Sequence, residues 1–127
     1  MDEGYIARTS WKEVDAYLNG VVERVNPKDF SGVYGIPRGG QVLAAWLSHK
    51  LYLPLLFEPK SACIIIDDIC DSGETLLHHV RNSSSKDGKD RNYFITTMFY
   101  RENDLEIKPD HYWKLKGDSW IVFPWEE

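Results

Sequence analysis

One stretch constrains the fold of this chain more than any other: residues 62–75, Ala-Cys-Ile-Ile-Ile-Asp-Asp-Ile-Cys-Asp-Ser-Gly-Glu-Thr. It begins as an apolar run rich in β-branched side chains, which is typical of a strand buried on both faces. Three acids and a Ser-Gly-Glu-Thr turn follow, and residues 76–80 have the pattern of a helix start. A strand, a polar loop and a helix in this order present backbone N–H groups to an anion. The stretch therefore predicts a phosphate site beside acids at the end of a buried strand.

The N-terminal region predicts an amphipathic helix that packs on a sheet. Ser10 and Glu13 have the spacing of a capping box, in which each side chain bonds the other residue's backbone N–H. Residues 26–27, Asn-Pro, end the pattern. Between them, apolar side chains recur at helical spacing, with the first expected to anchor the core: Trp11, Val14, Leu18, Val21, Val22 and Val25.

A second strand–loop–helix unit follows. Residues 32–36 read as a strand, Pro-Arg-Gly-Gly at 37–40 as its loop, and the chain from Gln41 as a helix. Arg38 offers a planar fork of donors suited to phosphate, and the glycines allow backbone to approach a ligand closely. A Gly-rich turn with a solvated arginine explains the same residues equally well when the loop is considered alone.

The remaining elements complete an α/β pattern. Strands are expected at 53–57 and 93–100, a short hairpin from 112–115 and 120–123, and an exposed Ser/Gly-rich loop at 82–90. Alternating strands and helices predict a single domain, residues 1–127, with a mainly parallel sheet flanked by helices on both faces and a small C-terminal hairpin. Ligands bind such sheets outside the carboxyl ends of the strands, where three loops would meet: 37–40, 67–75 and 101–104.

Composition excludes several classes of function. The 127 residues carry a net charge of −5, with 20 acids against 15 Lys and Arg, and no basic stripe of the kind that nucleic-acid binding needs. No apolar run is long enough to cross a membrane, and the first residues do not resemble a signal peptide. The only two cysteines, Cys63 and Cys70, lie in or beside the predicted central strand. We therefore expect no disulfide framework and a cytoplasmic protein.

The acids and the turn at 67–75 suit a sugar phosphate. Vicinal Asp67 and Asp68 can accept hydrogen bonds from a ribose diol or hold Mg²⁺ through water. Ser72, Thr75 and nearby N–H groups can surround a phosphate at the helix start. An acid after a strand can simply cap the next helix, but a cap requires one acid, and this stretch has three with a glycine turn.

At this point the sequence resembles a known family. Residues 64–75 are similar to the long signature of type I phosphoribosyltransferases: an apolar strand, two acids, an apolar residue, any residue, an acid and then [ST]-G-x-T. Residues 35–40 are similar to the pyrophosphate loop of that family. Residues 118–125 are similar to the C-terminal segment of its xanthine–guanine and hypoxanthine branch. The three motifs stand in the expected order.

The resemblance implies a role for each matching residue. Asp67 and Asp68 match the acids that bind the ribose hydroxyls of phosphoribosyl pyrophosphate (PRPP) and its Mg²⁺. Asp71 matches the acid that faces N7 of a purine and acts as general base or acid. Other matches are the residues of the 5′-phosphate loop and the pyrophosphate contacts: Ser72, Gly73, Glu74 and Thr75, then Arg38 and Gly39. Trp120 matches an aromatic that stacks on the base, although a tryptophan that only packs in a hairpin is the alternative.

Two departures from the family pattern stand out. Family enzymes carry a long flexible loop before the signature strand, and here only residues 58–61 separate Phe57 from Ala62. The purine branch places a base-contacting lysine after the strand at 93–100, where this chain has Arg101. A cation is kept at that position, but with a different geometry.

The resemblance implies an enzyme of purine salvage, a Mg²⁺-dependent purine phosphoribosyltransferase that transfers 5-phosphoribosyl from PRPP to a 6-oxopurine and releases pyrophosphate. The rival reading is a non-catalytic PRPP- or nucleotide-binding regulator of the same fold, which the short 58–61 turn favours. The expected partners are PRPP and a purine base, without nucleic acid or membrane. A homo-oligomer, dimer or tetramer, is also expected because three tryptophans could supply apolar surface: Trp46, Trp113 and Trp125.

Overall fold

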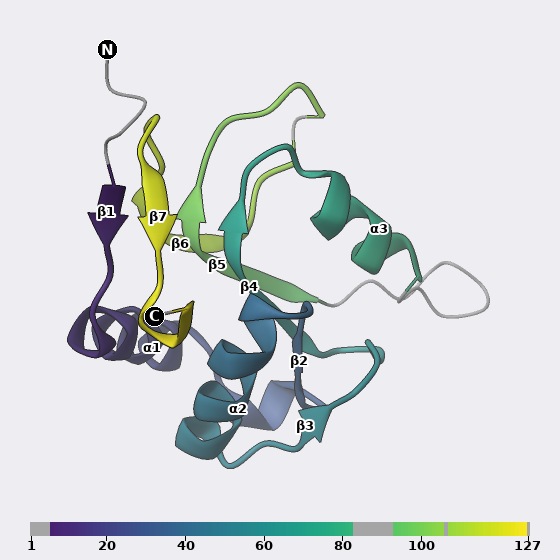
Figure 1. The fold of residues 1–127 in the computed structure, drawn as a ribbon. Coiled ribbons are helices and arrows are strands. Elements are labelled where there is room, and N and C mark those ends of the chain that lie inside the picture. Colours follow the sequence, from purple (N-terminus) through teal and green to yellow (C-terminus); the bar gives the residue numbers. More distant parts are fainter. Residues whose placement is uncertain (1–5, 83–92, 106, 127) are drawn as a thin grey trace.

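The structure, a computed structural model, describes residues 6–82, 93–105 and 107–126. Its centre is a five-stranded sheet in the order β3-β2-β4-β5-β6, and every neighbouring pair is parallel (Figure 1). The strands are β2 (Val33–Gly35), β3 (Leu55–Leu56), β4 (Ile64–Cys70), β5 (Phe94–Tyr100) and β6 (His111–Leu115). The predicted mainly parallel sheet is confirmed.

Helices cover both faces of this sheet. The helices α1 (Trp11–Arg24) and α2 (Gly39–Leu51) pack on one face, and α3 (Glu74–Asn82) packs on the other (Figure 1). Side chains of β4 alternate between the two layers: Ile64 and Ile66 join the core under α1 and α2, and Ile65 joins the core under α3. All three are fully buried, as the apolar run at 62–66 predicts for a central strand.

Helix α1 begins as its sequence predicts. The Ser10 hydroxyl accepts from the Glu13 backbone N–H at 3.1 Å, and the Glu13 carboxylate accepts from the Ser10 N–H at 3.0 Å. The predicted role of Trp11 is wrong. Its side chain is 49% exposed and packs against the rings of Trp46 and Trp125 instead of entering the core. The first helical position lies at the edge of the buried stripe, whose centre is formed by Val14, Tyr17, Leu18 and Val21.

The predicted C-terminal hairpin is wrong, because its two strands lie in different sheets. Strand β6 extends the central sheet beside β5, and β7 (Trp120–Val122) pairs in parallel with β1 (Ile6–Arg8), a strand that was not predicted. The pairing sets Ile6 opposite Trp120, and the Thr9 N–H donates to the Val122 carbonyl at 2.9 Å. The start of the described chain therefore holds the segment that carries Trp120.

Two short 3-10 helices, Pro27–Asp29 and Pro124–Glu126, follow α1 and β7. Cys63 and Cys70 are buried free thiols. No helix within the described residues is both long and apolar enough to cross a membrane. The exposed loop predicted at 82–90 lies outside the described residues except for residue 82, which ends α3.

Candidate active site

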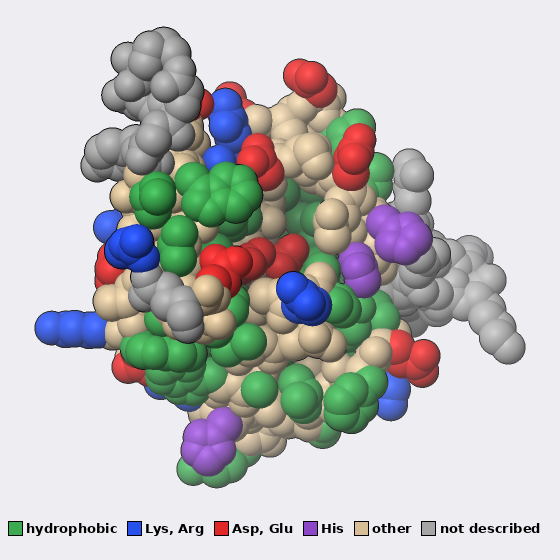
Figure 2. Space-filling model, in the orientation of Figure 1, with side chains coloured by type: hydrophobic (Ala, Val, Ile, Leu, Met, Phe, Trp, Pro, Cys, Tyr) green, Lys and Arg blue, Asp and Glu red, His purple; other side chains and the backbone are tan. Residues whose placement is uncertain are grey.

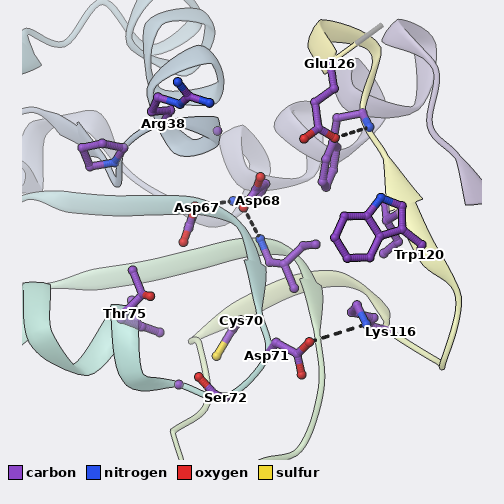
Figure 3. Close-up of a pocket in the computed structure, with 17 residues that line it drawn as sticks. Arg38, Asp67, Asp68, Cys70, Asp71, Ser72, Thr75, Lys116, Trp120 and Glu126 are labelled. Carbon is purple, nitrogen blue, oxygen red and sulfur yellow. Dashed lines mark hydrogen bonds and ion pairs between the residues drawn. The ribbon is translucent and has the colours of Figure 1, made fainter.

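A cavity of about 460 Å³ opens at the edge of the sheet where β2, β4 and β6 end. Figure 2 shows acidic side chains gathered near the middle of this face, with basic and hydrophobic side chains around them. Most residues predicted to form the site line this cavity (Figure 3): Arg38, Gly39, Asp67, Asp68, Asp71, Ser72, Gly73, Thr75 and Trp120. The fold thus brings the three sequence motifs to one place.

The two adjacent acids lie within β4 and not after it. Asp67 still pairs with Thr97 of β5, and its side chain is only 8% exposed. Its Oδ1 accepts from the Asp68 N–H at 2.8 Å, and Asp68 Oδ1 accepts from the Ile69 N–H at 2.8 Å. Burial, followed by the neighbouring carboxylate, raises the pKa of Asp67, and burial also raises the pKa of Asp68. A cation or a set of hydroxyl donors placed between these oxygens would relieve that penalty.

The loop after β2 approaches β4 so closely that glycine is required. A Cβ on Gly39 would overlap Oδ2 of Asp68, and a Cβ on Gly40 would overlap the Ile66 carbonyl. Arg38 is exposed at the rim of the cavity, and its peptide bond with Pro37 is cis. The loop therefore lays its backbone directly beside the acid pair and carries the Arg38 side chain at the rim of the same cavity.

The turn before α3 has the geometry of an anion site. Gly73 has φ +85°, which turns the chain into the helix, and the Gly73 carbonyl accepts from the Leu77 N–H at 2.9 Å. The Ser72 hydroxyl accepts from the Glu74 N–H at 3.3 Å. Ser72 and Thr75 are exposed and line the cavity, so their hydroxyls and the first N–H groups of α3 can receive a phosphate. Glu74 does not line the cavity.

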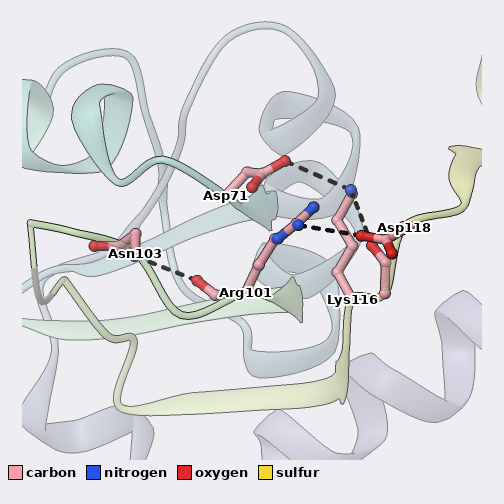
Figure 4. Close-up of polar contacts among 6 residues, drawn as sticks. Asp71, Arg101, Asn103, Lys116 and Asp118 are labelled. Carbon is pink, nitrogen blue, oxygen red and sulfur yellow. Dashed lines mark hydrogen bonds and ion pairs between the residues drawn. The ribbon is translucent and has the colours of Figure 1, made fainter.

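The opposite wall is formed by the C-terminal segment. Trp120, 71% exposed, presents its ring to the cavity from β7. Across from it, Oδ2 of Asp71 lies 3.5 Å from Nζ of Lys116, the residue after β6 (Figure 4). Arg101, the predicted base contact, does not line the cavity; its guanidinium donates to Oδ1 of Asp118 at 3.1 Å.

Two charged lining residues were missed by the sequence reasoning: Lys116 and Glu126. The carboxylate of Glu126 accepts from the Phe123 N–H at 2.9 Å and closes the final turn over the cavity. A parallel assignment of β6 would have pointed to Lys116, because residues that follow parallel strands meet at one edge of the sheet. No local signal marks Glu126.

Comparisons with known proteins agree with this geometry. No family model matches the sequence. The chain is 22% identical over 143 residues to the xanthine-guanine phosphoribosyltransferase of Idiomarina loihiensis, covering 92% of this chain and 84% of that protein. Its structure matches a purine phosphoribosyltransferase from Pyrococcus horikoshii with a TM-score of 0.80 and 26% identity, covering 100% of this chain and 96% of the other. These likenesses support the type I phosphoribosyltransferase family for this chain.

A second solved structure supports the same fold. The xanthine-guanine-hypoxanthine phosphoribosyltransferase of Helicobacter pylori matches with a TM-score of 0.75 and 21% identity, over 96% of this chain and 94% of that one. At this identity the match shows the fold, which is that of a phosphoribosyltransferase.

The segment between β3 and β4 is short in this chain. Residues 57–63 connect the two strands, and none of them lines the cavity. The side chain of Phe57, at the start of this segment, is 89% exposed. Within this segment, therefore, nothing covers the site in the way that the long loop of related enzymes does.

The acid pair fits a magnesium ion that is shared with a substrate. Among the described residues, no group of three or more His, Cys, Asp or Glu side chains is arranged to hold a metal ion. Asp67 and Asp68 supply hard oxygen ligands with raised pKa values, and Mg²⁺ characteristically keeps several waters and binds through one or two carboxylates together with phosphate oxygens. The donor set therefore fits an ion that arrives with a pyrophosphate.

Proposed function

We propose that this phosphoribosyltransferase transfers the 5-phosphoribosyl group of PRPP to a 6-oxopurine (hypoxanthine, guanine or xanthine) and releases pyrophosphate. One observation carries the proposal: the acid pair, the phosphate turn, the Arg38 loop and Trp120 all line one cavity of about 460 Å³. A volume of that order suits a nucleotide-sized ligand.

The sugar phosphate is positioned by β4 and the turn that follows. Asp67 and Asp68 accept hydrogen bonds from the ribose 2′- and 3′-hydroxyls, and they are also the residues that would hold Mg²⁺. The loop of Ser72, Gly73, Glu74 and Thr75 binds the 5′-phosphate at the N-terminus of α3. When bound, Mg²⁺ supplies positive charge that offsets the negative charge on the pyrophosphate group.

The reacting groups are positioned by the two walls of the cavity. Arg38 and the backbone at Gly39 bind the pyrophosphate, so that it leaves toward a cation and backbone donors. The ring of Trp120 stacks on the purine. Asp71 lies beside the base and accepts or returns a proton at N7 while a purine nitrogen attacks C1 of the ribose. Catalysis comes from this positioning and from electrostatics.

A second candidate function is a PRPP or nucleotide sensor of the same fold. The observation that favours it is the short 57–63 segment, which contributes nothing to the cavity, because water is excluded poorly from an uncovered site. Asp71 and the stacking ring of Trp120 favour the enzyme, since a sensor has no need for a base-facing acid.

The two candidates differ in turnover and not in binding. The test is to titrate PRPP with Mg²⁺ by calorimetry and, separately, to follow nucleotide formation with hypoxanthine, guanine, xanthine and adenine. The enzyme binds PRPP and forms nucleotide with a 6-oxopurine. PRPP binding without nucleotide from any base would favour the sensor, and no PRPP binding would contradict both.

We also expect a homo-oligomer, dimer or tetramer. Its interface should differ from the tryptophan surface that the sequence predicted. Trp46, Trp113 and Trp125 are partly buried against the core, whereas Tyr52 and Phe57, beside edge strand β3, are 92% and 89% exposed. Such side chains are typical of an interface. Light scattering on the purified protein measures the mass, and a monomer at all concentrations would contradict the expectation.

We place the reaction in the cytoplasm, as part of purine salvage. The two thiols, Cys63 and Cys70, are free and buried, as is common in proteins of a reducing compartment. Cell fractionation tests the location, and recovery of the protein outside the cytoplasmic fraction would contradict it.

A further inference from the structure

We propose that Lys116, and not Arg101, is the cation that recognises the exocyclic oxygen of the base, and that Lys116 and Asp71 together select 6-oxopurines. The inference rests on the proposed function and names a specificity-determining residue for it. Lys116 lies in the connection between β6 and β7, whereas the resemblance placed the base-contacting cation directly after β5 in the chain.

The position of Lys116 is fixed by the sheet. Its backbone N–H donates to the Tyr100 carbonyl at 2.7 Å, which continues the β5–β6 pairing one residue beyond β6. The side chain then reaches into the cavity, where its ammonium lies 3.5 Å from Oδ2 of Asp71 (Figures 3 and 4). The ammonium is therefore held at the cavity wall, beside the acid proposed for proton transfer.

The ammonium has capacity for another acceptor. The Lys116 side chain is only 13% exposed, and in the part of the chain that the structure describes it has two polar neighbours, Asp71 at 3.5 Å and the Gly117 carbonyl at 3.4 Å. Both distances are long for a hydrogen bond to an ammonium, which carries three donors. A largely covered ammonium with incomplete partners can donate a hydrogen bond to an oxygen of a ligand in the cavity.

Arg101 is engaged elsewhere. Its guanidinium bonds Asp118 at 3.1 Å, its side chain is 44% exposed, and it does not line the cavity (Figure 4). Asp118 lies two residues after Lys116, so the Arg101–Asp118 pair links the end of β5 to the turn that carries Lys116. Arg101 therefore contacts the turn that carries Lys116, and of these two cations only Lys116 lines the cavity.

The pair of charges matches the edge of one class of purine. A 6-oxopurine presents its O6 acceptor next to N7, whereas adenine presents an amino donor at the same place. An ammonium beside O6 and a carboxylate beside a protonated N7 satisfy both groups of the oxopurine. The amino group of adenine would instead face the ammonium, and because both groups are donors no hydrogen bond could form between them. Lys116 thus attracts one class of base and repels the other.

The experiment compares Lys116→Met with a matched control, Lys114→Met, after melting curves show that both fold. Lys114 is an exposed lysine of β6 whose ammonium lies over the Trp113 ring. For each protein one measures KM for hypoxanthine and for adenine, kcat, and the dissociation constant of PRPP. Because a hydrogen bond to a charged group is lost, Lys116→Met should raise KM for hypoxanthine about 10–100-fold and reduce the preference over adenine. PRPP binding and the Lys114→Met enzyme should match wild type.

Arg101→Gln is the rival variant, and Lys116→Gln replaces the methionine variant if that one does not fold. An unchanged hypoxanthine KM in the Lys116 variant, or a larger loss in Arg101→Gln than in the Lys116 variant, overturns the proposal while the proposed function stands. A wild-type protein that forms no nucleotide from any base overturns both. The two failures are therefore distinguishable.

Discussion

Asp67 and Asp68 are adjacent carboxyls on a central strand. The fold buries Asp67 and partly buries Asp68, without a basic side chain in the same strand. Their raised pKa values express the cost of that arrangement, because the ionised forms lose water and face each other. Sites of this kind are stabilised by what they bind, and the free protein carries the penalty. The acid pair therefore lowers the stability of the unliganded protein.

Asp67→Asn should stabilise the free protein and abolish PRPP binding. A pKa that is higher in the folded than in the unfolded state contributes stability below the unfolded value, near pH 4, and that contribution is lost as pH rises through the folded value. At pH 8 in a metal chelator, the variant should melt roughly 3–8 °C above wild type, for a gain of about 1–2 kcal/mol. Near pH 4 the difference should vanish. A variant that melts below wild type at pH 8 would contradict the charge argument.

Asp71→Asn should impair turnover more than PRPP binding. Asp71 lies 3.5 Å from Lys116, at the side of the cavity proposed for the base, and the sugar is proposed to bind at Asp67 and Asp68. Since general acid–base catalysis contributes about 10²–10⁴-fold, kcat should fall within that range while the dissociation constant of PRPP changes little. Asp104→Asn, which removes an exposed acid outside the cavity, is the control for charge alone. Equal losses in kcat and PRPP binding would contradict a base-facing role.

Among the elements, the loop between β2 and α2 is the most tightly constrained. Gly35, Gly39 and Gly40 each lack room for a Cβ. The Gly40 backbone blocks Gly35, the Asp68 carboxylate blocks Gly39, and the Ile66 carbonyl blocks Gly40. The loop packs against β4 at the acid pair, which fixes the distance between the parts of the cavity proposed for pyrophosphate and for ribose. The glycines in this loop therefore serve contact with β4 as well as approach to a ligand.

Gly39→Ala should weaken PRPP binding, because its Cβ would overlap the Asp68 carboxylate and force the acid or the loop to move. Overpacking of this kind costs about 1–3 kcal/mol, or about 5–150-fold in the dissociation constant if the cost falls on the bound state. Calorimetry with PRPP measures it. Gly117→Ala is the matched control, since nothing lies within 4 Å of its added Cβ. Wild-type affinity in Gly39→Ala would show that the contact is unimportant.

The C-terminal elements show what local patterns miss. Residues 112–115 and 120–123 have strand composition and a Lys-Gly-Asp-Ser connection, which predicts a hairpin. The chain instead sends β6 into the central sheet and β7 to β1, because both strands gain parallel partners far away in sequence. The residues of a turn indicate that the chain reverses or bends there, but they do not indicate which distant strand each flanking segment pairs with.

At the scale of the whole molecule, the sequence predicted the layers, and most of the residues that it predicted for the site line one cavity. The apolar run before Asp67 requires a buried strand, and the capping box at Ser10 marks the start of α1, so these elements depend on local chemistry alone. Strand β1 is three residues long, too short for any periodicity, and it exists only because β7 pairs with it. Lys116 and Glu126 reach the cavity through such distant pairings, and their residue types alone do not mark them.

The candidate site lies at one edge of the central sheet. Loops from β2, β4 and β6 meet there, and the β1–β7 pair adds the wall that carries Trp120 (Figure 1). Each motif is ambiguous by itself: a Gly-rich turn, two acids, an exposed tryptophan. Their convergence on one cavity is what supports phosphoribosyl transfer, since sugar, phosphates and base require all three at once.

The central claim is tested most directly by mixing the purified protein with PRPP, Mg²⁺ and hypoxanthine and quantifying nucleotide and pyrophosphate together. The account predicts that both appear in equal amounts, that the rate saturates in each substrate, and that adenine is a poorer base. Consumption of neither substrate under conditions where calorimetry detects bound PRPP would contradict it.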